Sequence, residues 1–103
     1  MSKVNKNELI RTVAKKNKIS IAEATRIYDS FVSEIYNIMA EGKSLSLTGF
    51  GLFYLHKHKG HPVQFEGDTK VNDYVVFKFS ASDVFNKRLR DGYDKGEVVV
   101  KKR

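Results

Sequence analysis

The chain has 103 residues, 41% of them hydrophobic, which predicts one domain with a thin core and excludes a disordered chain. Its 19 Lys and Arg against 12 Asp and Glu give a net charge of +7, which favours nucleic acid, an anionic membrane or an acidic protein as partner. We expect no membrane span and no signal peptide, and the absence of cysteine excludes disulfides and thiolate metal sites.

The first predicted element is a helix that begins at Asn5. Glu8 follows at the spacing of a capping box, and apolar residues recur at helical spacing as far as Ala14. The basic segment 15–18 breaks this pattern and is predicted to end the helix.

A second helix is predicted to begin at Ser20, which also has an acid at the capping-box position. Its wide apolar stripe includes Phe31 and Ile35, and we interpret the stripe as core rather than as a groove for a partner. Gly42 is a stop signal and ends the helical part of the chain.

After this glycine the pattern changes to the alternation that is typical of strands. Residues 44–48 and 52–55 predict two strands, and residues 74–79 predict a third. Glycines on both sides of a phenylalanine at 49–51 indicate a turn or bulge between the first two.

A basic segment separates the second and third strands. Residues 56–64 hold two lysines, all three histidines and the only proline of the chain, and no acid. Such a segment cannot support a core, so we expect it to project into solvent. Its two lysines lie two residues apart and would share one side of a strand, with the first two histidines on the other side.

The last predicted element is a short helix, with Ser80 and Asp83 at the spacing of a capping box and a stop near Gly92. Helices followed by strands indicate an α+β fold. We expect a single domain, 1–103, with a helical dimerisation part (1–42), a β-sheet (43–79) that carries an arm over about 56–73, a C-terminal helix (80–92) and a basic tail (93–103).

Five strings in the chain resemble the bacterial HU and integration host factor family of histone-like proteins. They are residues 5–10, 13–14, 19–20, 40–43 and, above all, residues 47–53 with their Gly-Phe-Gly string. The resemblance implies an intertwined homodimer with two N-terminal helices under a β-sheet, a cytoplasmic, nucleoid-associated protein. It further implies β-ribbon arms that enter the minor groove of double-stranded DNA and bend or compact it, largely without sequence specificity. The dimer core would include Phe31, Ile35, Phe50, Phe53 and Phe77.

The resemblance also suggests a DNA site. Pro62 matches the family's wedge between base pairs, with a turn former at an edge strand as the alternative interpretation. Thr48 and Gly49 would face phosphates, or form a structural bulge. The candidate DNA-binding residues are Lys6, Lys43, Thr48, Gly49, His56, Lys57, His58, Lys59, His61, Pro62, Gln64, Lys70, Lys78, Lys87 and Arg88.

The chain departs from the family in its arm. The stretch between Leu55 and Phe77 is shorter than expected, and three acids, Glu66, Asp68 and Asp73, lie on its returning half. These acids keep open the alternative of a protein-interaction factor that retains the dimer body but wraps less DNA. A sequence-specific regulator with a helix-turn-helix over residues 7–42 is a second alternative.

The three histidines prompt two further hypotheses. Metal binding lacks a completing ligand set, so we expect no metal and no cofactor. Protonation of His56, His58 and His61 is expected to tighten DNA binding, because each proton adds a positive charge to the arm. We find no catalytic motif and expect neither an enzyme nor a small-molecule substrate.

Overall fold

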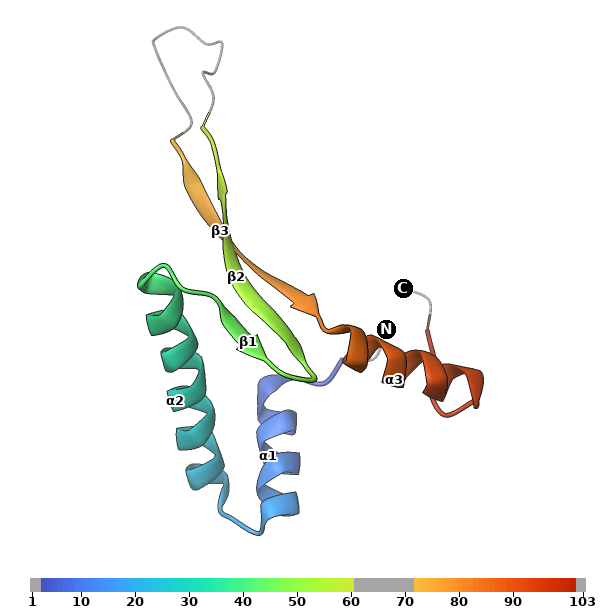
Figure 1. The fold of residues 1–103 in the computed structure, drawn as a ribbon. Helices are drawn as coiled ribbons and strands as arrows, with labels where there is room; N and C mark the ends of the chain where they lie inside the picture. The colour runs from blue at the N-terminus through green and yellow to red at the C-terminus, as the bar shows by residue number, and fades with distance from the viewer. Residues whose placement is uncertain (1–2, 61–71, 102–103) are drawn as a thin grey trace, which may run out of the picture. The chain divides into compact units, whose positions relative to one another are not determined.

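The computed structural model describes residues 3–60 and 72–101 (Figure 1). The elements, in chain order, are α1 (Lys6–Asn17), α2 (Ile21–Ala40), β1 (Leu45–Leu47), β2 (Gly51–His58), β3 (Tyr74–Ala81) and α3 (Asp83–Asp94). This order confirms the predicted α+β class. The chain divides into two compact units, one formed by the residues up to Asn37 together with those from Val99, the other by Ile38–Val98.

Helix α1 begins as predicted, because the side chain of Asn5 accepts a hydrogen bond of 2.9 Å from the Glu8 N–H. The predicted break at residues 15–18 is wrong, since the helix continues through Asn17. Lysine is a good helix former, and its charge is favourable in the last turn. The helix ends at Lys18, which takes the left-handed conformation with φ 55° and donates its N–H to the carbonyls of Ala14 and Lys15.

Helix α2 also begins at its predicted cap. The Ser20 Oγ accepts a hydrogen bond from the Glu23 N–H at 3.0 Å and donates one to the Glu23 carboxylate at 3.3 Å. Two hydrogen bonds therefore join Ser20 to Glu23 at the start of the helix. The helix ends at Ala40, and Gly42 adopts a positive φ of 77° with its N–H on the carbonyl of Met39. The stop signal in the sequence is therefore confirmed.

The core of the helical unit is small. Ile10 and Ala14 of α1 and Ala24 of α2 are buried, and Ile19 and Tyr28 pack against them half-buried. Much of the apolar stripe of α2 remains exposed in the protomer, including Phe31.

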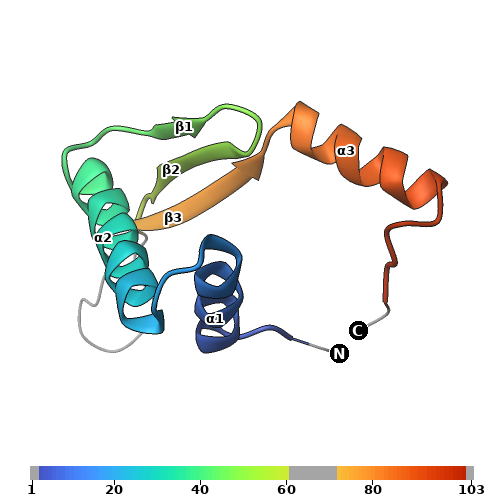
Figure 2. The same cartoon turned by 90° about the horizontal axis from the view of Figure 1, so that it is seen from below.

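The three strands form one antiparallel sheet in the order β1-β2-β3, which Figure 2 shows with β2 in the middle. Strand β1 is shorter than predicted and is followed by a turn in which Gly49 has a φ of 83° and the Phe50 N–H bonds to the Leu47 carbonyl at 2.9 Å. Strand β2 is longer than predicted and runs to His58, which pairs with Tyr74. The first part of the predicted arm is thus a regular two-stranded ribbon.

A cluster of phenylalanines lies where the sheet meets the last helix. Phe50 has its ring centroid 5.0 Å from that of Phe79 and 5.4 Å from that of Phe85, and Phe53 stacks on Phe77 at 5.6 Å. The cluster joins the turn after β1, both long strands and α3 by aromatic contacts.

Helix α3 differs from the prediction at both ends. Its cap is Ser82, whose Oγ accepts from the Phe85 N–H at 3.0 Å, and not Ser80, because β3 continues to Ala81 to pair with Gly51. The helix also ends two residues beyond Gly92, near which the stop was predicted. Gly92 is buried inside the helix, which runs to Asp94.

The chain after α3 folds back onto this glycine. The N–H groups of Glu97 and Val98 reach the Gly92 carbonyl at 2.8 and 3.2 Å, and a Cβ on Gly92 would lie 2.7 Å from a methyl carbon of Val98. Glycine at position 92 therefore serves a close approach of the chain rather than the end of a helix.

Candidate nucleic-acid interface

The long ribbon of β2 and β3 has two chemically different faces. Directly opposed residues in an antiparallel pair share a face, and the faces alternate along each strand. One face carries apolar and aromatic pairs, namely Phe53 with Phe79 and Leu55 with Phe77, and ends in Lys57 with Val75. The other face is polar and partly aromatic, and carries Tyr54 with Lys78, His56 with Val76, and His58 with Tyr74.

The histidines of the polar face form a short column of rings with a tyrosine. The ring centroids of His56 and His58 lie 4.6 Å apart in an edge-to-face arrangement, and His58 stacks on Tyr74 at 5.1 Å. The prediction that His56 and His58 share one side of a strand is therefore confirmed. The part played by Tyr74 depends on strand register, which the sequence pattern does not specify.

Lys57 lies on the opposite face and is paired with an acid from the returning strand. Its Nζ lies 3.5 Å from Oδ2 of Asp73, whose Oδ1 accepts a hydrogen bond of 2.6 Å from the Gly60 N–H. The local absence of acids in residues 56–64 is thus offset across the ribbon. Lys59, the other lysine of this segment, lies beyond the end of β2 and is exposed.

Three other candidate lysines also have carboxylate partners. Both members of each pair are well exposed, so each pair adds little to stability and leaves its lysine open to competition from phosphates. The pairs are Lys6 with Asp29 at 3.7 Å, Lys43 with Glu41 at 3.3 Å, and Lys87 with Asp91 at 3.2 Å. Lys78 and Arg88 are exposed and make no ion pair within residues 3–60 and 72–101.

Thr48 and Gly49 lie at the turn after β1 and line a shallow hollow of about 300 Å³ whose wall is part polar and part apolar. The hollow is also lined by three serines, Ser46, Ser80 and Ser82, and by the acidic residue Asp83. The positive φ of Gly49 supports the structural interpretation of this turn, and the hydroxyl groups around it are donors suited to phosphate, so the two interpretations are compatible.

Four candidates, His61, Pro62, Gln64 and Lys70, lie outside the described residues. The wedge role of Pro62 therefore stays a prediction.

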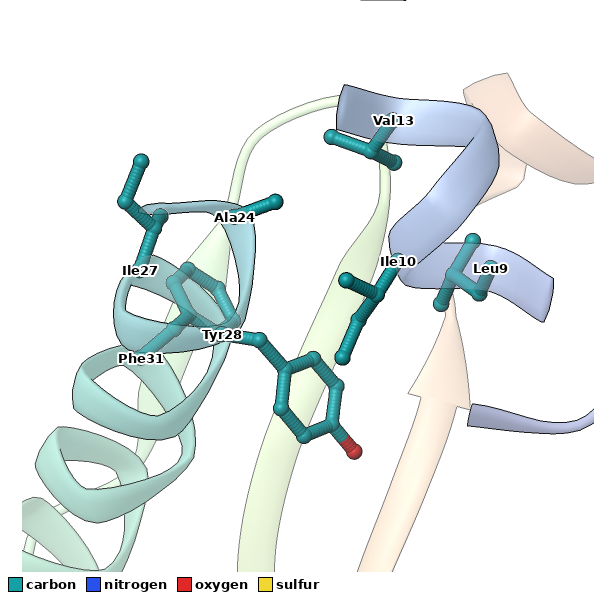
Figure 3. Close-up of a pocket in the computed structure, with 7 residues that line it drawn as sticks. All are labelled: Leu9, Ile10, Val13, Ala24, Ile27, Tyr28 and Phe31. Carbon is teal, nitrogen blue, oxygen red and sulfur yellow. The ribbon is translucent and has the colours of Figure 1, made fainter. Parts of the chain in front are cut away.

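The candidate dimer core is incompletely covered within one protomer. Phe31 is 53% exposed and Phe77 51% exposed, Phe50 is also exposed, and Ile35 and Phe53 are half-buried. In the helical unit, Phe31 borders an apolar hollow of about 160 Å³ between α1 and α2 (Figure 3). Its other lining residues are Leu9, Ile10, Val13, Ala24, Ile27 and Tyr28. Exposed apolar surface of this kind is typical of a protein–protein interface.

Within the described part of the chain, no group of three histidine or acidic side chains is placed to hold a metal ion. No helix in that same part is long and apolar enough to cross a bilayer.

The chain has a helix pair and an antiparallel sheet, two strands of which extend into a ribbon that carries cationic side chains. These features define an α+β protein of the HU type. The chain belongs to this family of bacterial DNA-binding proteins, since the family's sequence model, described as "Bacterial DNA-binding protein", matches residues 4–90.

Comparison with individual proteins agrees with this membership. DNA-binding protein HU of Xylella fastidiosa strain Temecula1 is 41% identical over 59 residues, which are 57% of this chain and 63% of that protein. DNA-binding protein HU-beta of Neisseria meningitidis serogroup A is 35% identical over 52 residues, which are 50% of this chain and 58% of that protein. The chain thus matches about three fifths of the length of these relatives.

Two solved structures share the fold. HU from an Anabaena HU–DNA cocrystal has a TM-score of 0.70 at 24% identity, over 82% of this chain and 96% of that chain. HU from Thermotoga maritima has a TM-score of 0.59 at 25% identity, over 82% of this chain and 97% of that chain.

Proposed function

We propose that this protein binds double-stranded DNA as a homodimer, largely without sequence specificity, and bends or compacts it as a nucleoid-associated protein of the cytoplasm. Its family and the names of its relatives support DNA binding. The observation that carries the proposal is the two-faced ribbon, with Lys78 and the histidine pair on one face and the phenylalanines on the other.

The binding mechanism is neutralisation of phosphates. Lys78 and Arg88 are exposed and bind phosphates directly, while Lys6 and Lys87 exchange the carboxylate that each of them faces for a phosphate. A lysine ammonium on a flexible stem follows the DNA backbone without reading bases, which accounts for binding without sequence preference.

Bending is assigned to the arms. An apolar, rigid side chain that enters between base pairs kinks the duplex, and the unstacking of a step is offset when bent DNA contacts more protein. Pro62 has the chemical character that this step requires.

The exposed phenylalanines support the homodimer. A second copy of the chain would cover apolar surface that the protomer leaves in solvent and would place a second ribbon on the same DNA. A dimer with two arms would contact a duplex from two sides, whereas a single protomer has one arm.

The first test is the affinity for a random duplex, measured by fluorescence anisotropy over a series of salt concentrations. We expect log K to fall linearly with log salt, with a slope of about −0.9 for each phosphate neutralised. Competition with unrelated duplexes should displace the labelled DNA equally well, whereas a helix-turn-helix regulator would retain its preferred site. A protein that ignores duplex DNA at the lowest salt concentration overturns the proposal.

The second test is ring closure of a short DNA fragment, with the wild-type chain and with Pro62→Ala. We expect wild-type protein to accelerate closure, and the variant to lose most of this acceleration while keeping most of its affinity, because phosphates supply the affinity. Equal acceleration by both proteins removes the wedge but leaves DNA binding in place.

One observation favours an alternative function. Four candidate lysines already face carboxylates, which would suit a protein-interaction factor that retains the HU-like body and wraps less DNA. The same salt series distinguishes this alternative, because it requires weak binding with a shallow slope.

A further inference from the structure

We propose that Asp73 sets the strength of DNA binding by holding Lys57 away from phosphates at the base of the arm. The inference rests on the proposed function and adds to it a residue that limits affinity. It concerns one carboxylate with two partners, Lys57 and Gly60.

The carboxylate connects the two strands of the ribbon just beyond their last ladder pair, His58 with Tyr74. Asp73 directly precedes β3, and its Oδ1 accepts the Gly60 N–H at 2.6 Å while its Oδ2 lies 3.5 Å from the Lys57 Nζ. The two oxygen atoms thus have separate tasks. One is tied to the backbone of the outgoing chain, and the other faces the lysine.

The backbone contact distinguishes Asp73 from the other paired acids. Among the hydrogen bonds within residues 3–60 and 72–101, the carboxylates of Asp29, Glu41 and Asp91 receive none from a backbone N–H. These acids are free to rotate away when a phosphate arrives. Asp73 is held in place by Gly60 and stays beside Lys57 as a fixed negative charge.

The ion pair itself is weak, because the side chains of Lys57 and Asp73 are 67% and 52% exposed. Exposed pairs of this kind change an equilibrium by no more than about fivefold. A phosphate would nevertheless meet the carboxylate together with the lysine, and the two charges cancel at a distance. Lys57 therefore adds almost nothing to phosphate neutralisation while Asp73 is ionised.

The substitution Asp73→Asn separates the two tasks. Its amide oxygen still accepts the Gly60 N–H, so the ribbon keeps its shape, but the negative charge is gone. We expect DNA binding at low salt to tighten by up to about fivefold, which is the most that release of an exposed pair can supply. The slope of log K against log salt should steepen by about 0.9, because one more lysine neutralises a phosphate.

Asp94→Asn is the matched control for net charge. It makes the same change of one unit at the end of α3, where no ion pair to Asp94 occurs within the described residues. We expect the slope for this variant to stay at the wild-type value. An equal gain from both variants would show that net charge alone is responsible and would overturn the inference.

Lys57→Gln, made in the wild-type chain and in the Asp73→Asn chain, completes a double-mutant cycle for this ion pair. In the wild-type background we expect almost no change of slope, and in the Asp73→Asn background a return to the wild-type slope. A substantial loss of slope from Lys57→Gln alone would mean that Lys57 already contacts phosphate, which contradicts the inference.

The contact is also measurable without DNA. The Gly60 amide proton should lie at a similar NMR position in the wild-type and Asp73→Asn chains and shift upfield in Asp73→Ala, which has no acceptor. An unchanged Gly60 signal in Asp73→Ala overturns the geometry on which the inference stands. If wild-type protein fails to bind duplex DNA, the proposed function fails and the inference fails with it. If wild-type protein binds and the Asp73→Asn slope is unchanged, only the inference fails.

Discussion

Gly51, the first residue of β2, is buried beside the phenylalanine cluster and has no room for a side chain. A Cβ there would lie 2.6 Å from two ring carbons of Phe79 and 2.6 Å from the Ser80 carbonyl oxygen. Because one of these neighbours is backbone, we expect Gly51→Ala to lower the free energy of unfolding by about 1–3 kcal/mol. Urea denaturation at one fixed protein concentration measures this.

Gly49→Asn is the control for Gly51→Ala. Gly49 has open space around its Cβ position, and asparagine tolerates its positive φ better than other residues with a side chain. We expect this variant to be much less destabilised. A urea midpoint for Gly51→Ala that equals the wild-type midpoint would contradict the close approach.

The histidines make a separate prediction about pH. His56 and His58 share the polar face of the ribbon with Tyr74 and Lys78, and His61 follows in the arm. The hypothesis that protonation of these histidines tightens DNA binding predicts a higher affinity for duplex DNA at about pH 5.5 than at about pH 8, at fixed salt. The triple His→Gln variant should lose this dependence, and a flat wild-type profile would remove the hypothesis.

At the scale of single elements, the start of α3 depends on one hydroxyl. Ser82 caps the helix through the Phe85 N–H, so we expect Ser82→Ala to cost about 1 kcal/mol of stability. Ser80→Ala, at an exposed position within β3, should stay within about 0.5 kcal/mol of the wild-type protein. Thermal denaturation of both variants measures the two losses of stability. A larger loss for Ser80→Ala than for Ser82→Ala would indicate that Ser80 caps the helix, as the sequence suggested.

The kind and order of the elements were predictable because each depends on local pattern. Asn5 and Ser20 cap their helices through side chains that reach only three residues ahead. The cap at Ser82 was missed because strand pairing between Gly51 and Ala81 determines where β3 ends. The role of Gly92 was missed because the residue that packs on it, Val98, arrives from beyond the helix.

The candidate site was predictable to a similar extent. A period of two was enough to place His56 and His58 on one side of a strand. The contact of Asp73 with Lys57 and Gly60 depends on the register of two strands whose connection is long, and no local pattern specifies that register. Phe79 and Phe85 were not assigned to the aromatic cluster for the same reason, although Phe79 lies two residues from Phe77 and shares its face.

At the scale of the whole molecule, the exposed apolar side chains predict that folding depends on assembly. If a second copy covers Phe31 and Phe77, the thermal midpoint must rise with protein concentration. A hundredfold increase in concentration contributes about 2.7 kcal/mol to the folded dimer. Calorimetry over that range, with sedimentation to give the mass, tests this, and a constant midpoint with a monomer mass would contradict the homodimer.

The exposed phenylalanines also have a consequence for the lifetime of the protein in the cell. If the protein is a homodimer, an unassembled protomer exposes to chaperones and proteases the apolar surface that a second copy would cover, and assembly then competes with degradation. Pairing accelerates with the number of copies present, whereas clearance of each copy does not. We therefore expect the protein to be short-lived when it is scarce and long-lived when it is abundant, so that its cellular amount would rise more than in proportion to its rate of production.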